Sequence, residues 1–134
     1  MKLVPFDRHN SEAMVDLLSL YESWGHPECC PTPDALPKCG WTVPGVAACF
    51  LYETDSSSCF LDNAIVKRGE PGHTDAISAI VEKLLEEAGR RGFRKVYANT
   101  GNHAAANRAV VLGFKPSTEP YRMQLEREVP RGQE

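Results

Sequence analysis

The chain lacks several features that would place it in a class at once. No apolar run approaches the roughly 20 residues that span a bilayer, so no membrane-spanning helix is expected. The first ten residues, MKLVPFDRHN, lack the apolar core of a signal peptide, and the expected location is the cytoplasm. The net charge is −3 and no concentrated basic stretch is present, so nucleic-acid binding is not expected.

The cysteines do not form a recognisable framework. There are five of them, and an odd number without a secretion signal argues against a disulfide scaffold. His26, Cys29, Cys30 and Cys39 are spaced His-x-x-Cys-Cys-x₈-Cys, which follows no common two-pair zinc arrangement. We therefore expect no metal site.

What the chain does contain is typical of one globular domain. Its 134 residues are 42% hydrophobic and 25% charged, as in ordinary soluble proteins. This length fits a single domain, which we expect over residues 1–128. Residues 129–134 are expected to form a flexible C-terminal tail.

Hydrophobic periodicity predicts an α/β protein. Asn10 or Ser11 can cap a first helix that ends near Gly25, and residues 26–40 are expected to form a long loop, with or without a short helical turn. The strongest helical stripe follows Thr74, its expected N-cap, and runs to about residue 88. Strands are expected at 3–6, 41–43, 46–53, 59–66, 94–99 and 121–126, with a short helix at 103–112. The order is β-α-β-β-β-α-β-α-β, with the strands at 59–66 and 94–99 parallel across a right-handed crossover.

The segment from Asn102 to Phe114 carries the most specific motif. It reads Asn-His-Ala-Ala-Ala-Asn-Arg-Ala-Val-Val-Leu-Gly-Phe. A structural explanation is sufficient, because Asn102 can cap a helix, Gly113 can adopt a positive φ at its end, and Phe114 can pack back. The segment also resembles the Asn-x-x-Ala-x-x-x-Tyr-x-x-x-Gly-Phe motif of the GNAT N-acetyltransferase superfamily, and the element order resembles that family over nearly the whole chain.

The resemblance implies a mixed central sheet flanked by helices and a site for acetyl-CoA. In the family the pyrophosphate signature is Gln/Arg-x-x-Gly-x-Gly/Ala, and the stretch from Val66 to Ala76 is similar to it without keeping its spacing. Glycines let the backbone approach phosphates, and N–H groups at a helix start donate to an anion. Asp75 would repel a pyrophosphate unless nearby basic side chains offset its charge. The alternative is an ordinary turn and helix cap with no phosphate. The cofactor-binding residues implied by the resemblance are Ile65, Val66, Arg68, Gly72, His73, Thr74, Ala76, Asn102 and Arg108.

Acyl transfer to an amine needs a base for the attacking ammonium and can use an acid for the departing thiolate. Asp62 is the candidate base, and strict alternation would place it on the same strand face as Phe60 and Val66. The alternative is an Asp that is only hydrogen-bonded within its strand. Ala109 stands where the family carries its Tyr, so the acid is not assigned. Candidate substitutes are Tyr97, Tyr121, His103 and Cys59.

The leading hypothesis is an N-acyltransferase that moves an acetyl group from acetyl-CoA to a primary amine of an unidentified acceptor. The first helix and the loop at 26–40 would shape the acceptor pocket, with Trp24 either in that pocket or in the core. The alternative is a catalytically inactive GNAT-like interaction or assembly module, for example one associated with a virion, and Ala109 and Asp75 favour it. A regulator that keeps CoA affinity lies between the two. Folds of this kind can pair final strands between subunits, which leaves a homodimer open.

Overall fold

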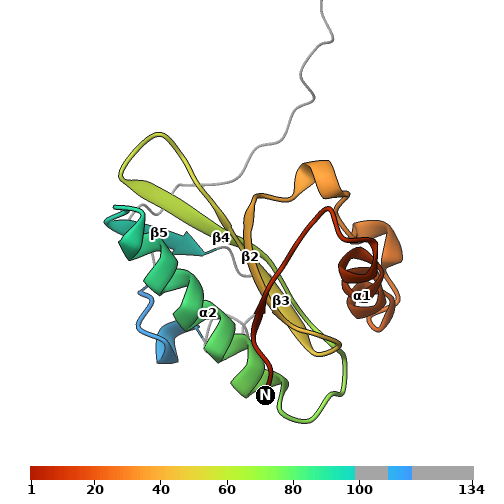
Figure 1. Ribbon diagram of the computed structural model, residues 1–134. Helices are drawn as coiled ribbons and strands as arrows, with labels where there is room; N and C mark the ends of the chain where they lie inside the picture. Colours follow the sequence, from red (N-terminus) through yellow and green to blue (C-terminus); the bar gives the residue numbers. More distant parts are fainter. Residues whose placement is uncertain (99–108, 116–134) are drawn as a thin grey trace, which may run out of the picture.

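The computed structural model describes residues 1–98 and 109–115. Their strands form one five-stranded mixed sheet in the order β1-β2-β3-β4-β5 (Figure 1). Strands β1 to β4 pair with one another in antiparallel fashion, and β5 pairs parallel with β4. The strands are β1 (Val4–Pro5), β2 (Cys39–Val43), β3 (Ala47–Tyr52), β4 (Ser58–Val66) and β5 (Lys95–Ala98). The α/β fold class and the parallel final pair are therefore confirmed. The expected strand at 121–126 and the tail at 129–134 lie outside the described residues.

The first helix begins where the sequence predicts. Helix α1 (Ser11–Glu22) has Asn10 as its N-cap, and the Asn10 side-chain oxygen accepts a hydrogen bond from the Ala13 N–H at 3.1 Å. The following loop contains two 3₁₀ turns, η1 (Pro27–Cys29) and η2 (Pro33–Ala35). Each turn begins at a proline, whose fixed φ suits the first position of a helix.

The second helix, α2 (His73–Arg90), begins two residues earlier than a cap at Thr74 would allow. Its N-cap is Gly72, in the left-handed region at φ 80°, and the expected cap at Thr74 is wrong. The first intrahelical bond runs from the Ala76 N–H to the Gly72 carbonyl at 3.0 Å, which places Thr74 inside the first turn. Glycine is suited to this position because it has no Cβ to clash at positive φ.

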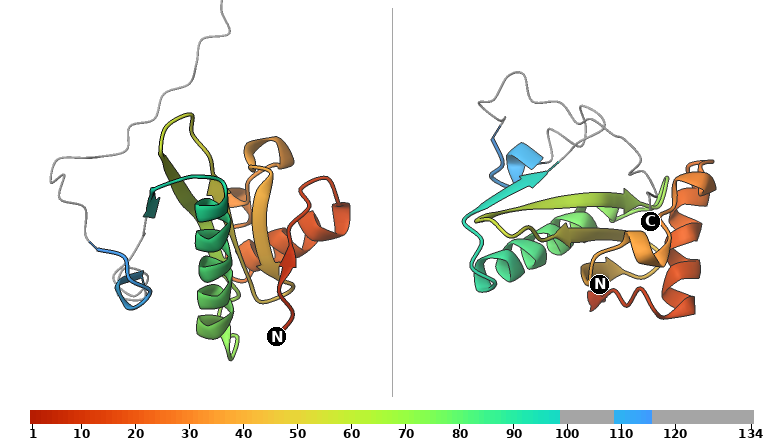
Figure 2. Two further views of the ribbon diagram at one scale, coloured as in Figure 1. Left: turned by 60° about the vertical axis from the view of Figure 1, so that its left-hand side comes forward. Right: turned by 90° about the horizontal axis from the view of Figure 1, so that it is seen from above.

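The two helices lie on opposite sides of the sheet (Figures 1 and 2). Each covers its own apolar cluster, so alternate residues of the strands face different helices. The cluster under α2 consists of Cys39, Val43, Ala47, Cys49, Leu51, Cys59 and Leu61 from the strands with the apolar stripe of the helix. The cluster under α1 consists of Phe6, Leu17, Leu20, Tyr21, Leu36, Ala48 and Phe50.

The described part of the late motif behaves as the structural explanation requires. Residues 109–111 are helical, and Gly113 follows at φ 95°. The Phe114 N–H donates to the Ala109 carbonyl at 3.0 Å, and the Phe114 ring packs against the cluster under α2. Gly113 and Phe114 therefore end a helix and return the chain to the core.

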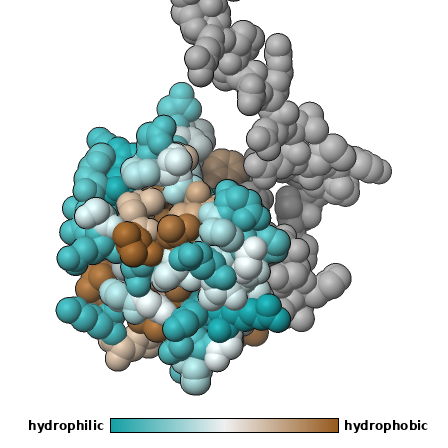
Figure 3. Space-filling view, turned by 90° about the vertical axis from the view of Figure 1, so that its right-hand side faces the viewer, coloured by the Kyte–Doolittle hydropathy of each residue, from teal (hydrophilic) through white to brown (hydrophobic). Residues whose placement is uncertain are grey.

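The surface on the α1 side is mostly hydrophilic, with small apolar areas between the polar groups (Figure 3). Val15 and Trp24 contribute exposed apolar side chains from α1 and the residues after it. Among the described residues, no helix combines the length and the apolar character needed to cross a membrane.

Candidate functional site

Strand β4 contains a bulge that the sequence did not predict. Ala48 of β3 lies opposite Ile65, whereas Phe50 lies opposite Asp62, so β4 has one more residue than β3 between these pairs. Asn63 adopts φ 54°, and it alone among the described non-glycine residues has a positive φ. The Asp62 carboxylate accepts a hydrogen bond from the Asn63 N–H at 2.7 Å, which supports this turn of the backbone. Bulges of this kind re-aim side chains and main-chain groups.

The bulge corrects the expected alternation along β4. Asp62 is opposite Phe50 and shares the α1 side of the sheet with Phe60, as predicted. Val66 does not share that side, because it packs with the cluster under α2. The extra residue reverses the alternation beyond the bulge, which period-2 reasoning from sequence does not anticipate.

Three polar side chains, those of Asn63, Tyr52 and Tyr21, lie near Asp62. The Asn63 side-chain amide donates to the Tyr52 hydroxyl from the neighbouring strand. Burial raises the pKa of Tyr52, and the negative charge of Asp62 raises it further. Burial likewise raises the pKa of Tyr21, which lies on α1. Both phenols therefore stay protonated near neutral pH, and both can donate hydrogen bonds next to the half-buried carboxylate.

Sequence reasoning missed Tyr52 and Tyr21 as site residues. Tyr21 lies within the predicted first helix and Tyr52 within the predicted strand at 46–53, and neither position by itself indicates a site. The predicted hairpin at 46–66 could have indicated Tyr52. In its observed register Tyr52 lies opposite Phe60, which is two residues before Asp62 on the same strand. The bulge that brings Asn63 to Tyr52 carried no such signal.

Strand β4 continues beyond its described pairing with β5. The parallel register runs from the Ser58–Lys95 pair to the Leu61–Ala98 pair within the described residues. The Lys67 N–H donates to the Val46 carbonyl at 2.7 Å. Antiparallel ladders alternate, so Ile65 turns its main-chain groups toward β3 and Val66 turns its own away from β3. Of these two predicted cofactor ligands, Val66 presents its main chain on the β5 side of β4.

The turn between β4 and α2 contains two glycines with positive φ and open space beside them. Gly69 and Gly72 have φ values of 75° and 80°, and a Cβ built on either would meet no heavy atom within 4 Å. No side chain caps the N-terminus of α2. A helix start without a side-chain cap is suited to an anion such as a phosphate. Asp75 is exposed in the same first turn and opposes that anion.

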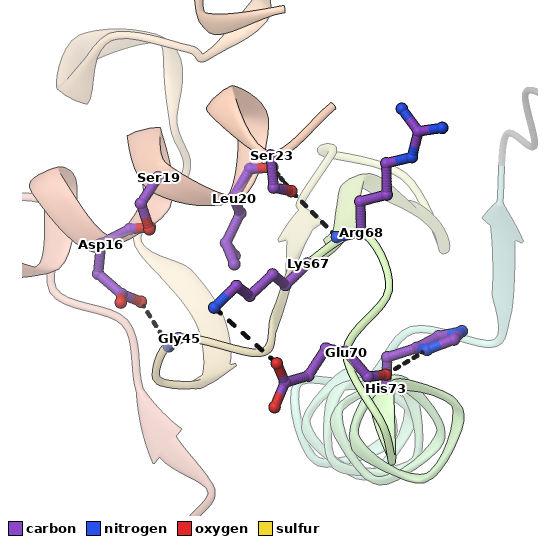
Figure 4. A network of polar contacts seen from close by, with 9 residues as sticks. All are labelled: Asp16, Ser19, Leu20, Ser23, Gly45, Lys67, Arg68, Glu70 and His73. Atoms are coloured by element: carbon purple, nitrogen blue, oxygen red, sulfur yellow. Dashed lines mark hydrogen bonds and ion pairs between the residues drawn. The ribbon is translucent and has the colours of Figure 1, made fainter. Parts of the chain in front are cut away.

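The basic residues of this turn already have partners, and Figure 4 shows the contact of Lys67 with Glu70 and the main-chain bond of Arg68 to Ser23. The Lys67 ammonium lies 3.9 Å from the Glu70 carboxylate. The Arg68 guanidinium lies 5.5 Å from the centroid of the Trp24 ring, and the Arg68 N–H donates to the Ser23 hydroxyl oxygen at 3.0 Å. Through Arg68 the turn therefore contacts Ser23 and Trp24, the two residues that follow α1.

His73 is oriented by the same turn. Its Nδ1 lies 2.8 Å from the Glu70 carbonyl oxygen. A carbonyl only accepts, so Nδ1 carries a proton in this contact and Nε2 points elsewhere. His73 and Ala76 thus stand at the start of α2, where the prediction placed them, with Ala76 buried against the sheet.

The candidate acids differ in accessibility. Cys59 is buried on the α2 side, and burial raises the pKa of its thiol. Tyr97 stacks on Phe60 with ring centroids 5.6 Å apart. Ala109 lies in the described helical segment and offers no ionisable side chain. The predicted site residues Asn102 and Arg108, and the candidates His103 and Tyr121, lie outside the described residues.

The loop after α1 shows no metal geometry. Cys29 is exposed and Cys39 is buried, and all five cysteines are free thiols. Across residues 1–98 and 109–115, no group of three or more His, Cys, Asp or Glu side chains could hold a metal ion. His26 instead lies 3.1 Å from Glu28, on the surface.

No protein-family model matches the chain, and no curated protein matches it significantly in sequence. Solved structures do match. A protein described as a probable acetyltransferase has a TM-score of 0.73 at 16% identity, covering 96% of this chain and 99% of that one. An aminoglycoside acetyltransferase from an uncultured soil metagenomic sample, in complex with sisomicin, has a TM-score of 0.65 at 12% identity, covering 96% and 95%. A GNAT-family acetyltransferase from Streptococcus pneumoniae has a TM-score of 0.62 at 16% identity, covering 97% and 98%. The resemblance inferred from the sequence is thereby confirmed, and the chain has the fold of the GNAT acetyltransferases.

Proposed function

We propose that the chain is an N-acyltransferase that moves an acetyl group from acetyl-CoA to a primary amine. The observation that carries the proposal is the bulge at Asn63, followed on the same strand by the outward main chain of Val66 and then by the open turn at Gly69 and Gly72. One continuous segment thus offers main-chain groups along β4 and N–H groups at the start of α2. An extended arm ending in a pyrophosphate matches this order of donors and acceptors.

Asp62 would act as the base. It lies at the bulge, on the side of the sheet that α1 covers, beside the protonated phenols of Tyr52 and Tyr21. Acetyl-CoA would supply an acyl thioester, whose carbonyl carbon the amine attacks. The carbon–sulfur bond then breaks, the amide forms, and CoA leaves as a thiolate that solvent can protonate. Asp62 would remove the proton from the attacking ammonium, directly or through one water, and main-chain N–H groups of β4 would donate to the thioester oxygen.

The cofactor end would be held by the turn and by α2. The main-chain groups of residues 72–76 would donate to the pyrophosphate, and Arg68 and Lys67 would compensate its charge against Asp75. Asn102 and Arg108, on the late motif, would complete the site. Three of the similar structures are aminoglycoside acetyltransferases, which makes amino sugars a sensible first class of acceptor to test.

Ala109 favours the second candidate, an inactive interaction or assembly module. An alanine at the family's Tyr position cannot protonate a thiolate, and a lost general acid commonly lowers the rate by about 10²–10⁴-fold. A fold alone does not establish an activity. The two candidates make different predictions about ligand binding, and one measurement separates them.

The test is thermal melting of the chain with millimolar acetyl-CoA and, as a polyphosphate control, with ATP at the same concentration. A ligand that binds only the folded state stabilises it by about 2.7 kcal/mol at 100 times its Kd. We expect the melting temperature to rise with acetyl-CoA and not with ATP, and free thiol to appear when a panel of primary amines is added. A melting temperature that neither acetyl-CoA nor longer acyl-CoAs change would overturn the proposal in favour of the interaction module. A rise without thiol release would support a regulator that keeps CoA affinity.

A further inference from the structure

The end of α1 is bonded to the strand and turn of the proposed cofactor site. The Trp24 indole N–H donates to the Val66 carbonyl at 2.6 Å, across 42 residues of sequence. Next to it, the Ser23 hydroxyl accepts from the Arg68 N–H at 3.0 Å and itself donates to the Leu20 carbonyl at 2.6 Å. These contacts join the end of α1 to the last residue of β4 and to the turn that follows, and Figure 4 shows the bond between Ser23 and Arg68.

The Val66 carbonyl that Trp24 occupies is the one turned away from β3. The Lys67 N–H points to β3, and successive residues of a strand turn their main-chain groups to opposite sides. Val66 also lies beyond the last described pair of β4 and β5, which is Leu61 with Ala98. The indole therefore uses a main-chain acceptor on the side of β4 where the pantetheine arm would run in the proposed function.

The same indole engages the cation of the turn. The Arg68 guanidinium lies 5.5 Å from the ring centroid, within the range of a cation–π contact. Trp24 thus holds two of the predicted cofactor ligands, one by its N–H and one by its ring face. Its side chain is nevertheless 42% exposed, and Gly25 follows it at φ 78° with open space around it. The ring belongs to neither apolar cluster, so it can leave without disturbing the core.

We propose that Trp24 is a latch on the acyl-CoA site: its indole N–H occupies the Val66 carbonyl and its ring holds Arg68 until the pantetheine amide and the pyrophosphate replace these two contacts. The inference rests on the proposed function, because it names what regulates that same site. Acyl-CoA then binds only to molecules in which the indole has moved away. The apparent affinity is lower than the intrinsic affinity by the fraction of such molecules.

Trp24→Phe tests the hydrogen bond alone. Phenylalanine keeps a ring that Arg68 can face but has no N–H for the Val66 carbonyl. One hydrogen bond of ordinary strength then no longer competes with the ligand, so the Kd for acetyl-CoA should fall by about 2- to 10-fold. Trp41→Phe is the matched control, since Trp41 lies on β2 with Lys83 over its ring, and its Kd should equal that of the wild type.

Fluorescence follows the movement directly. The chain has two tryptophans, so Trp41→Phe leaves Trp24 as the single indole. Titration of this variant with acetyl-CoA should shift its emission to longer wavelength as the ring leaves Val66 and Arg68 for solvent. The shift should follow the same binding curve as isothermal titration calorimetry.

The possible outcomes distinguish a failure of the Trp24 latch from a failure of the proposed acyl-CoA binding. If acetyl-CoA binds the wild type and Trp24→Phe equally, and the emission of Trp24 does not change, the latch is wrong and the acyl-CoA site stands. If neither protein binds acetyl-CoA, the proposed function fails and the latch fails with it. Binding by Trp24→Phe that is tighter than that of the wild type, with a wild-type Kd for Trp41→Phe, supports both.

Discussion

The side-chain amide of Asn63 donates to the hydroxyl of Tyr52, and this bond ties the bulge of β4 to the end of β3. The two residues stand 11 apart in sequence and on adjacent antiparallel strands. Asn63 can take its positive φ because asparagine tolerates the left-handed region better than most residues. The bond therefore helps to define the backbone that presents Asp62.

The contribution of this bond can be measured with a double-mutant cycle of Tyr52→Phe and Asn63→Gly. Glycine keeps the positive φ, and phenylalanine keeps the ring, so each single change removes the hydrogen bond with little else. Each variant should lose about 0.5–1.5 kcal/mol of unfolding free energy, and the double variant should lose less than the sum. Urea unfolding of the four proteins gives the coupling, and strict additivity would mean that the two side chains act independently.

Asp62→Asn should slow acetyl transfer by about 10²–10⁴-fold in kcat, because the amide cannot remove a proton from the ammonium. The Asp62 carboxylate also accepts the Asn63 N–H, and asparagine keeps an oxygen for that bond. The measurement is the rate of thiol release with a saturating amine at neutral pH. A kcat equal to that of the wild type would remove Asp62 from the mechanism.

Asp75→Asn tests the proposed pyrophosphate site at the start of α2 and should affect KM rather than kcat. Asp75 is exposed in the first turn of α2, where its charge opposes a bound pyrophosphate. Neutralising it should lower KM for acetyl-CoA by about 2- to 5-fold and leave kcat unchanged. An unchanged KM would indicate that the phosphates bind elsewhere.

The fold was largely accessible from sequence because its main elements carry strong local signals. The apolar stripe of α2 and the hairpin of β3 and β4 appear at helical and strand periods, and Asn10 is a cap of the preferred type. The errors fall where the backbone departs from a regular period. Gly72 displaced Thr74 as the cap, and the bulge at Asn63 reversed the faces beyond it.

The site was less accessible, since its contacts join residues that lie far apart in sequence. Trp24 meets Val66 across 42 residues, and no periodic pattern links a helix C-terminus to the end of a strand. Trp24 was expected in the acceptor pocket or in the core, and the structure gives it a third place, beside the turn before α2. Arg68 was expected near the cofactor from the motif, but its contact with the ring could come only from the tertiary structure.

A pair of glycine substitutions tests the packing of the sheet. A Cβ on Gly40 would lie 2.4 Å and 2.6 Å from two ring carbons of Phe50, which is fully buried. Gly40→Ala should therefore lower the unfolding free energy by about 1–3 kcal/mol. Gly89→Ala, on the exposed side of α2 with open space around it, should raise the free energy by about 0.5–1 kcal/mol. Equal effects from the two changes would contradict the close contact at Phe50.

The buried thiol of Cys49 predicts how stability changes in alkali. Burial raises the pKa of Cys49 from 9.0 to about 12, and the nearby Asp62 charge adds to this. Between these values the unfolded chain releases the proton and the folded chain keeps it, so the folded state binds more protons and stability falls as pH rises. The loss should approach about 1.4 kcal/mol per pH unit for this one group above a pH of about 9.

Cys49→Ala isolates that contribution. Tyr21 and Tyr52 also have raised pKa values and steepen the alkaline slope of the wild type, but the alanine variant retains both phenols. Urea unfolding under reducing conditions should give a lower stability for the variant at neutral pH, because a core side chain has been truncated. Its stability should then decline less steeply than that of the wild type above a pH of about 9, so that the two curves converge. Parallel curves across the alkaline range would show that Cys49 ionises equally readily in the folded and unfolded chains, against its position beneath the bulge.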